Sequence, residues 1–342
     1  MLSSIREEIV LRKEYLPIKN LRSVYFGGGT PSLLNPSEIK EILDLIRGHF
    51  ELDITAEITL EANPDDLSET IVHDLKSAGI NRLSIGIQSF RNEDLKWMNR
   101  AHTAEQALDA VNLSRSAGFD NITVDLIYGL PGLELPDWED HLQKVVSLDV
   151  DHISAYCLTI EERTALHKWV KTGSIKPAGE DLQSEQFDLM VRFLAAHGFE
   201  QYEISNFARN GKYAVHNSAY WTGESYLGVG PSAHSFNGNS RRWNVANNTR
   251  YIHSIGKNND WFEEELLSEK DKWNELILTG LRTAFGLDLK QLSTLRPLSD
   301  QFLDKIDEFS RYGWVRRSHD KIYLTPEGKL MADHISSELF IT

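Results

Sequence analysis

The chain has 342 residues, of which 41% are hydrophobic, and carries 36 Lys and Arg against 51 Asp and Glu, a formal charge of −15. This acidic balance disfavours a nucleic-acid-binding protein, and a single cysteine, Cys157, excludes an internal disulfide framework. No apolar run approaches the roughly 20 residues of a membrane span, and the first residues are too polar for a signal peptide, so we expect a cytoplasmic protein.

The first 160 residues predict strands that alternate with helices. Helical spacing of apolar residues indicates an amphipathic helix over 3–16. Five strands are then expected, at 21–26, 54–62, 82–90, 122–128 and 152–158, and the helices between them at 35–46, 68–78, 103–117 and 136–148. Such alternation requires right-handed crossovers and a parallel sheet covered by helices. The fold class is therefore α/β, either a barrel or a doubly wound sheet, and we favour the barrel.

The first predicted strand ends in three glycines, Gly27, Gly28 and Gly29, followed by Thr30 and Pro31. Glycines at this place leave room for a ligand to bind main-chain N–H groups, but they also suit a tight turn between a strand and a helix, and the residues alone leave both interpretations open. A dinucleotide-binding loop is excluded, because proline follows at once and no helix begins within the glycine run.

Polar residues also follow the other predicted strands. They are Glu61-Ala62-Asn63-Pro64, Gln88-Ser89-Phe90, Asp125 with the Gly129-Leu130-Pro131-Gly132 turn, and Thr159. Any one of them could be a helix cap or a turn residue. Together they line the carboxyl ends of five successive strands, which is where parallel α/β folds bind ligands.

The residues after 160 form two segments of different composition, followed by a C-terminal domain. Residues 161–197 predict helices with a break over 173–179, and 199–246 are rich in Gly, Asn, Tyr, Trp and His, which is typical of functional loops. His216 in this segment is either a hydrogen-bonded packing residue or a ligand. We expect three domains: 1–160, a barrel core; 161–267, a helical extension with binding-site loops; and 268–342.

The last domain predicts three helices, over 273–281, 287–295 and 301–309, then a hairpin of 314–317 with 321–324, and a final helix that begins at Pro326. This order resembles a winged helix. From Ser268 onward there are 11 basic and 12 acidic residues, so the charge that DNA contact requires is missing, and we expect a docking or covering domain.

Taken together, six segments resemble the radical S-adenosylmethionine (SAM) family of oxygen-independent coproporphyrinogen III oxidase-like proteins, and most of all its haem-chaperone branch. They are 25–32 (YFGGGTPS), 61–64 (EANP), 81–90 (NRLSIGIQSF), 99–102 (NRAH), 125–131 (DLIYGLP) and 216–221 (HNSAYW). The resemblance covers essentially the whole chain. It implies a partial (β/α)₆ barrel of the TIM-like radical SAM type, whose strand ends hold SAM against a [4Fe–4S] cluster.

The resemblance also implies roles for individual residues. Gly28, Gly29 and Thr30 would meet the methionine end of SAM, and the polar contacts around the cofactor would come from Glu61, Gln88, Arg100 and Asp125, with Thr159 as a further one. His216, Asn217, Tyr220 and Trp221 match a motif associated with haem, for which an imidazole is a competent axial iron ligand. No catalytic residue is assigned.

The chain departs from the family at its start. The family carries Cys-x₃-Cys-x₂-Cys after its first barrel strand, and this sequence has neither that strand nor those cysteines, while Cys157 lies on a later strand. We therefore expect that the chain as given forms no [4Fe–4S] cluster, and that it comes from a longer protein with roughly 30 more residues upstream, containing that strand and the cysteines. The alternative is a natural paralogue that lacks the cluster.

The function expected on these grounds is a haem-binding chaperone that delivers haem to acceptor proteins. The alternative is an oxygen-independent coproporphyrinogen III oxidase of porphyrin biosynthesis, so whether the chain is an enzyme stays open. A winged-helix regulator is disfavoured by the charge of the last domain.

Overall fold

The computed structural model describes residues 1–162, 164–257, 260–329 and 331–341. Two compact units divide the chain, and each is described by itself. Unit 1 comprises Met1–Arg22, Ile42–Ile54 and Val215–Thr342, and unit 2 comprises Ser23–Glu41 and Thr55–Ala214. Within the described ranges, no helix combines the length and the apolar character that crossing a bilayer requires.

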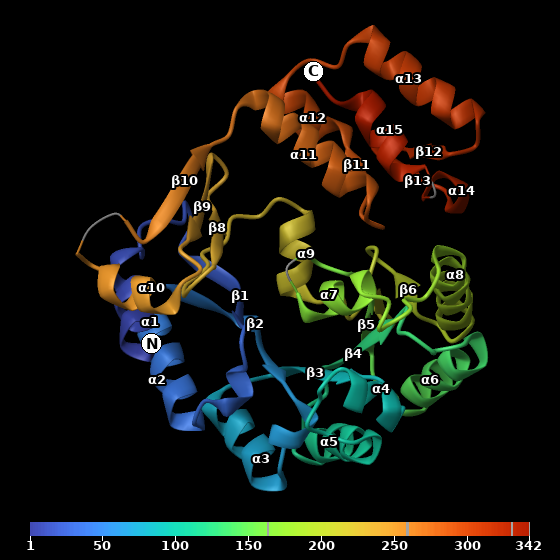
Figure 1. The fold of residues 1–342 in the computed structure, drawn as a ribbon. Helices are drawn as coiled ribbons and strands as arrows, with labels where there is room; N and C mark the ends of the chain where they lie inside the picture. Colours follow the sequence, from blue (N-terminus) through green and yellow to red (C-terminus); the bar gives the residue numbers. More distant parts are fainter. Residues whose placement is uncertain (163, 258–259, 330, 342) are drawn as a thin grey trace. The chain divides into compact units, whose positions relative to one another are not determined.

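A seven-stranded sheet runs through the first 210 residues in the order β1-β2-β3-β4-β5-β7-β6. Its strands are β1 (Asn20–Phe26), β2 (Glu51–Ala62), β3 (Arg82–Gln88), β4 (Ile122–Tyr128), β5 (His152–Cys157), β6 (Glu200–Gln201) and β7 (Asn206–Ala208). Strands β2 to β5 pair in parallel, whereas β7 pairs antiparallel with β5 and with β6. The sheet curls into an open half-barrel (Figure 1). The predicted α/β class and parallel strand order are therefore confirmed.

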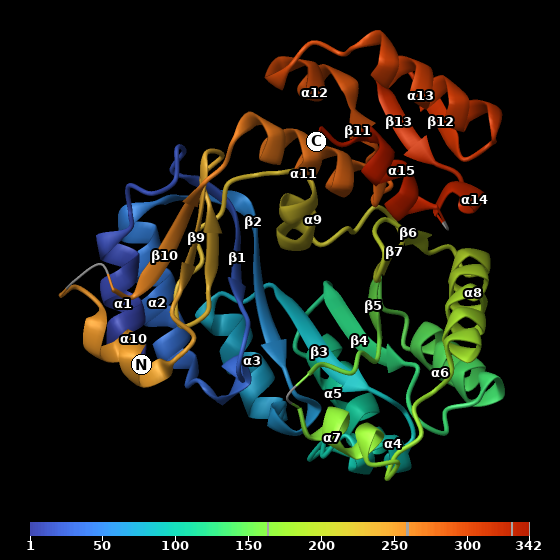
Figure 2. The same ribbon diagram turned by 45° about the horizontal axis from the view of Figure 1, so that its top comes forward.

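Helices cover the outer face of this sheet, with α3, α5 and α6 outside β2 to β5 in both ribbon views (Figures 1 and 2). The helices of this part are α2 (Pro36–His49), α3 (Glu69–Ala78), α4 (Asn92–Trp97), α5 (Ala104–Ser116), α6 (Leu135–Ser147), α7 (Ala165–Lys171) and α8 (Glu180–Ala196), with short 3₁₀ turns at Pro31–Leu33 and Pro64–Asp66. Helix α5 begins in a capping box, in which Thr103 accepts from the Gln106 N–H and the Gln106 side chain accepts from the Thr103 N–H. A local sequence signal therefore fixes where α5 starts.

The N-terminal helix of unit 1, α1 (Leu2–Leu11), is shorter than the expected 3–16. Beside it lie a three-stranded antiparallel sheet, in the order β10-β9-β8, and helix α10 (Asn248–Ser254) (Figure 2). The strands are β8 (His234–Phe236), β9 (Ser240–Asn244) and β10 (Phe262–Leu266). The prediction that 199–246 consists of loops is thus wrong in part. The strands in this segment have two to five residues, too few for their alternation to be recognised in the sequence.

Helix α1 is held by one fully buried carboxylate, Glu8. It accepts hydrogen bonds from Arg12 Nη1 (2.9 Å), the Gly230 N–H (2.8 Å), Asn244 Nδ2 (2.8 Å) and Tyr251 OH (2.5 Å). A buried charge is tolerated only where it is paired and hydrogen-bonded, and Glu8 meets that condition through both of its oxygens. Three of these four partners tie the first helix to residues that lie more than 200 positions later.

The C-terminal part of unit 1 packs around its own apolar core, built from Trp273, Ile277, Phe302, Phe309 and Ile322 among others. Its elements are α11 (Glu269–Leu281), β11 (Leu287–Asp288), α12 (Leu289–Leu295), α13 (Asp300–Arg311), β12 (Val315–Ser318), β13 (Lys321–Leu324), α14 (Pro326–Lys329) and α15 (Ala332–Leu339). The predicted three helices and hairpin are present, and β11 adds a third strand in the order β11-β13-β12.

Candidate functional site

The glycine turn after β1 is bound to the end of β2. Glu61 accepts from the Gly28 N–H through Oε2 (3.1 Å) and from Tyr25 OH through Oε1 (2.7 Å). A Cβ atom at Gly27 would lie 2.8 Å from Glu61 Oε1 and closer still to the Tyr25 ring, so only glycine fits there. Gly28 and Gly29 have φ of +72° and +73°, and a Cβ on either would meet nothing within 4 Å. These two therefore border open space.

Asp125 on β4 lies in the same polar layer of the half-barrel as Glu61. Ser84 on β3, which pairs in register with Glu61, donates to both Asp125 oxygens, at 3.2 and 3.0 Å from Oδ1 and Oδ2. Burial raises the pKa of Asp125 to about 6, and the negative charge of Glu61 adds to the rise although the bond from Ser84 opposes it. Burial and Glu61 likewise raise the pKa of Tyr25, which therefore stays a neutral hydrogen-bond donor.

Gln88 ends β3 in an unusual conformation. Its φ is +67°, and the β3–β4 register shifts between Ile85 and Gln88. A Cβ at Gly86 would lie 2.8 Å from Gln88 Nε2 and 3.7 Å from the carbonyl oxygen of Ala62 on β2. The Gln88 amide therefore folds back over Gly86 toward the end of β2, where Glu61 lies.

Arg100 is placed against the turn that follows β2. Its Nη1 donates to Asn63 Oδ1 (3.4 Å), and Asn63 Nδ2 in turn donates to Asp66 Oδ2 (3.4 Å). Ser32, just after the glycine turn, donates to the same Asp66 oxygen (2.5 Å). Arg100 is thus linked to both the β1 and β2 ends through Asn63 and Asp66.

The two threonines of the predicted SAM site are exposed. The carbonyl oxygen of Thr30 accepts from the Leu33 N–H (3.2 Å), so this residue opens the 3₁₀ turn. Thr159 lies two residues beyond β5. The structure therefore brings Gly28, Glu61 and Asp125 into one layer, whereas Thr159 lies in an exposed segment.

A second row of polar side chains crosses the half-barrel closer to the amino ends of its strands. Arg82 on β3 pairs with Glu57 on β2 (3.6 Å) and donates to Thr123 on β4. Thr123 Oγ1 lies 3.1 Å from His152 Nδ1 on β5, and His152 Nε2 lies 2.8 Å from Tyr202 OH. Burial lowers the pKa of His152 well below its ordinary value, so this imidazole is neutral. The row is an internal network, and the charge of Arg82 also acts on the pKa of Asp125 and of Tyr25, where it partly opposes the rise caused by burial.

The residues of the predicted haem motif lie on helix α9 (Val215–Trp221), which corrects the expectation of a loop there. His216 and Tyr220 are one helical turn apart, with Nε2 and OH separated by 3.0 Å and their rings edge to face at 5.1 Å. Tyr220 also contacts the Tyr226 ring, and burial raises the pKa of Tyr220 to about 12. Asn217 and Trp221 share the helix. The sequence VHNSAYW has too little apolar periodicity to predict it.

Four residues around the strand ends were given no role from the sequence: Tyr25, Ser84, His102 and His141. A signal for Ser84 was present, because Arg82 and Ser84 are polar at alternate positions between the buried apolar residues of β3. That alternation indicates a polar interior. No comparable pattern marks His141, which is the one imidazole on the buried face of α6.

The described residues offer no cluster of three or more His, Cys, Asp or Glu side chains arranged to hold a metal ion. Cys157 ends β5, and burial raises the pKa of its thiol. One protonated thiol does not fit a [4Fe–4S] cluster, which is held by cysteine thiolates.

Comparison with known proteins agrees with this geometry. Residues 4–145 match the model of the radical SAM superfamily, and 267–331 match that of the HemN C-terminal domain. The heme chaperone HemW of Bacillus subtilis is 32% identical over 339 residues, covering 98% of this chain and 89% of its own, and that of Lactococcus lactis is 30% identical over 337 residues, with the same coverage. The coproporphyrinogen III oxidase HemN of Escherichia coli superposes with a TM-score of 0.83 at 24% identity, over 99% of this chain and 82% of the oxidase.

The curled half-barrel, with polar residues at its strand ends, has the fold of HemN, and the match over 4–145 makes the chain a radical SAM protein. Within that class, the chain belongs to the HemW family of HemN-like proteins.

Proposed function

We propose that this protein is a haem chaperone, which binds haem and delivers it to acceptor proteins. The observation that carries the proposal is the similarity of nearly the whole chain to heme chaperones named HemW, at 30–32% identity. The oxidase alternative has weaker support, since the match to HemN lies below 25% identity and concerns the fold alone.

We further propose a cytoplasmic location. We also propose a division into three domains, with boundaries after residues 160 and 267, and the match of 267–331 to the HemN C-terminal domain supports the second boundary.

We propose that the strand ends of the half-barrel bind SAM. The donor set fits such a ligand: the glycine turn borders open space at Gly28 and Gly29, and Glu61, Gln88 and Asp125 supply carboxylate and amide groups. Carboxylates suit ribose hydroxyls, and an arginine such as Arg100 suits the carboxylate of the methionine moiety. Thr30 and Thr159 complete the proposed set. Bound SAM would supply the sulfonium chemistry of the family, and these residues would orient it.

A [4Fe–4S] cluster is characteristic of the family, but the residues of this chain do not fit one. The sequence contains one cysteine where three thiolates are needed. The proposed function therefore does not depend on a cluster, and haem binding is proposed to rest on other residues.

For haem we propose the helix α9 residues His216, Asn217, Tyr220 and Trp221. The imidazole of His216 is a competent axial ligand, and aromatic side chains cover a flat apolar macrocycle well. His216 Nε2 is engaged with Tyr220 OH in the structure, so iron ligation through that nitrogen requires the hydroxyl to move away. Tyr220 is 44% exposed, which leaves it room to do so.

A haem titration followed by absorption spectroscopy tests the proposal. His216→Ala should shift the Soret band and weaken binding at least tenfold, because an axial bond is worth more than the roughly 1 kcal/mol of an ordinary hydrogen bond. Tyr220→Phe, which removes the hydroxyl beside Nε2, should bind haem at least as tightly as the parent. His253→Ala on α10 is the matched control and should titrate like the parent.

A parent chain that binds no haem would refute the chaperone proposal. A His216→Ala variant indistinguishable from the parent would refute the ligand assignment alone, and would direct attention to His234 or Cys157.

A further inference from the structure

The backbone at Gln88 is held in a strained turn. The Ser89 N–H donates to the Ile87 carbonyl oxygen (2.8 Å) across Gln88, whose φ is +67°. An i to i+2 hydrogen bond around a residue with positive φ is a rare and strained γ-turn, and glutamine has a Cβ that disfavours it. Strained residues of this kind persist only where the surrounding structure holds them, and they cluster at functional sites.

One restraint lies before the turn. The Ile87 carbonyl oxygen, which accepts from the Ser89 N–H, also lies 3.0 Å from His102 Nε2. His102 is 3% exposed, and burial lowers its pKa, so the imidazole is neutral and Nε2 carries the hydrogen. Asp65 Oδ1, 3.7 Å from Nδ1, faces the opposite side of the ring. His102 therefore fixes the carbonyl group that opens the turn.

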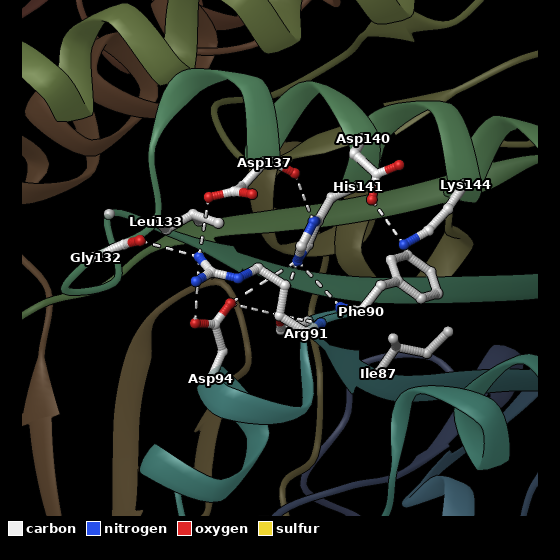
Figure 3. Close-up of polar contacts among 12 residues, drawn as sticks. Ile87, Phe90, Arg91, Asp94, Gly132, Leu133, Asp137, Asp140, His141 and Lys144 are labelled. Atoms are coloured by element: carbon white, nitrogen blue, oxygen red, sulfur yellow. Dashed lines mark hydrogen bonds and ion pairs between the residues drawn. The ribbon is translucent and has the colours of Figure 1, made fainter.

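A second restraint lies after the turn, and Figure 3 shows it. The Phe90 N–H donates to His141 Nε2 (3.1 Å), while His141 Nδ1 lies 2.7 Å from the Asp137 carbonyl oxygen one turn earlier in α6. These partners assign the hydrogen to Nδ1, and burial lowers the pKa of His141, which keeps the ring neutral. His141 is fully buried, so the nitrogen that receives the Phe90 N–H is fixed in the body of unit 2.

The neighbouring residues complete this restraint. The Ser89 hydroxyl lies 2.7 Å from Asp94 Oδ2 and 2.8 Å from His141 Nε2, two acceptors that share its one hydrogen, and its oxygen accepts from the Arg91 N–H (3.0 Å). The Arg91 guanidinium reaches the Gly132 carbonyl oxygen (3.0 Å) and Asp137 Oδ2 (3.3 Å) (Figure 3). The segment after Gln88 is thereby fastened to α4, to α6 and to the turn that precedes α6.

This group contains Ser, His and Asp, but its geometry is not that of a hydrolytic triad. The carboxylate of Asp94 bonds the serine instead of the imidazole, and His141 Nδ1 faces a backbone carbonyl group. Ser89 and His141 are also both fully buried, so no substrate reaches the hydroxyl.

We propose that His102 and His141 are positioning residues that hold Gln88 in its strained turn from both sides and so direct its amide toward the nucleoside cofactor at the strand ends. The proposal rests on the proposed SAM site for its functional part. Its structural part, that the two imidazoles impose the strain, stands on the hydrogen bonds alone. Gly86 contributes to the same arrangement, because the absence of a Cβ atom there leaves room for the Gln88 amide.

The test is a double-variant cycle on the full chain with two readouts, SAM affinity by equilibrium dialysis and thermal unfolding. The histidine variants are His102→Leu and His141→Leu, each made with and without Gln88→Gly, and His102→Gln serves as the conservative variant because its amide retains a donor. His152→Leu is the matched control, since it removes an equally buried imidazole that contacts neither side of the turn.

We expect His102→Leu and His141→Leu to weaken SAM binding about tenfold in the parent and to have no further effect in the Gln88→Gly background. His102→Gln should recover most of the affinity. Equal losses in both backgrounds would overturn the positioning role, since they would show a purely structural effect.

The thermal readout needs no ligand and therefore separates this inference from the proposed function. Gln88→Gly should raise the melting temperature of the parent, because glycine tolerates positive φ, and that gain should vanish once either imidazole is removed. In the His152→Leu background the gain should persist. If the parent binds no SAM, the SAM proposal fails, and the thermal cycle still decides whether the histidines impose the strain. A gain that is absent in the parent, or equal in every background, overturns the inference.

Discussion

Replacing Asp125 by asparagine should stabilise the fold at neutral pH and leave it unchanged in acid. Burial raises the pKa of Asp125 to about 6 from the ordinary value of 3.8. Between these values the folded chain keeps a proton that the unfolded chain releases, so the stability given by the neutral carboxyl is complete below about pH 4 and is lost as the pH rises through about 6.

The size of the effect follows from the shift. Above pH 7, a rise of about two pKa units lowers the free energy of unfolding by about 3 kcal/mol. Because Asp125 is only half-buried, this value is an upper limit. Asparagine has the same shape, can still accept from Ser84, and carries no charge to repel Glu61. We therefore expect Asp125→Asn to raise the free energy of unfolding by about 1–3 kcal/mol at pH 7.5, and by close to nothing at pH 4.

Urea unfolding of the parent and of Asp125→Asn across this pH range measures the difference. Asp151→Asn is the control with the opposite sign: burial alone would raise the pKa of Asp151, but hydrogen bonds from Lys212, Asn210 and Arg209 lower it. That variant should be destabilised at neutral pH and approach the parent in acid. A stability difference for Asp125→Asn that does not change with pH, or a less stable variant at pH 7.5, would refute the reasoning.

Two further substitutions test packing and a buried charge. Gly27→Ala should destabilise the fold by about 1–3 kcal/mol, since its Cβ would overlap the Tyr25 ring and approach Glu61, whereas Gly48→Ala, in open space on α2, should be neutral or stabilising in the same urea titration. Glu8→Ala leaves Arg12 buried without its carboxylate and should cost about 3–5 kcal/mol, while Glu14→Ala on an exposed ion pair should leave the unfolding midpoint unchanged.

The regular part of the fold could be predicted from the sequence because each strand from β1 to β5 is followed by a helix with its own start signal. Ser68 and Thr103 show this, since each caps a helix at the position that the sequence indicates. Strands β6 to β10 could not be predicted, whereas the C-terminal hairpin of β12 with β13 could. Strands β6 and β7 have two and three residues, and the antiparallel pairing of β7 with β5 and with β6 depends on the tertiary structure.

The candidate site also contains residues that could be predicted from the sequence and contacts that could not. Glu61 and Asp125 could be expected at or near the strand ends from their order in the chain; Glu61 is the penultimate residue of β2, whereas Asp125 lies in the middle of β4. The hydrogen bonds of Glu61 with Tyr25 and Gly28 could not be foreseen. These partners precede Glu61 by 36 and 33 positions, and the bonds depend on how the folded side chains are oriented. The positive φ of Gln88 is likewise a product of its surroundings, as glutamine has no intrinsic preference for that region.

The four partners of Glu8 also bear on the order in which a growing chain acquires its contacts. Gly230 and Tyr251 lie 222 and 243 residues after Glu8, so at about 5–20 residues per second the ribosome makes them roughly 10–50 s later. Residues 55–214 of unit 2 emerge within that interval and can pack together without α1. The first helix to be synthesised is therefore among the last to reach its final place, and a nascent chain arrested before residue 230 leaves Glu8 hydrated and α1 undocked.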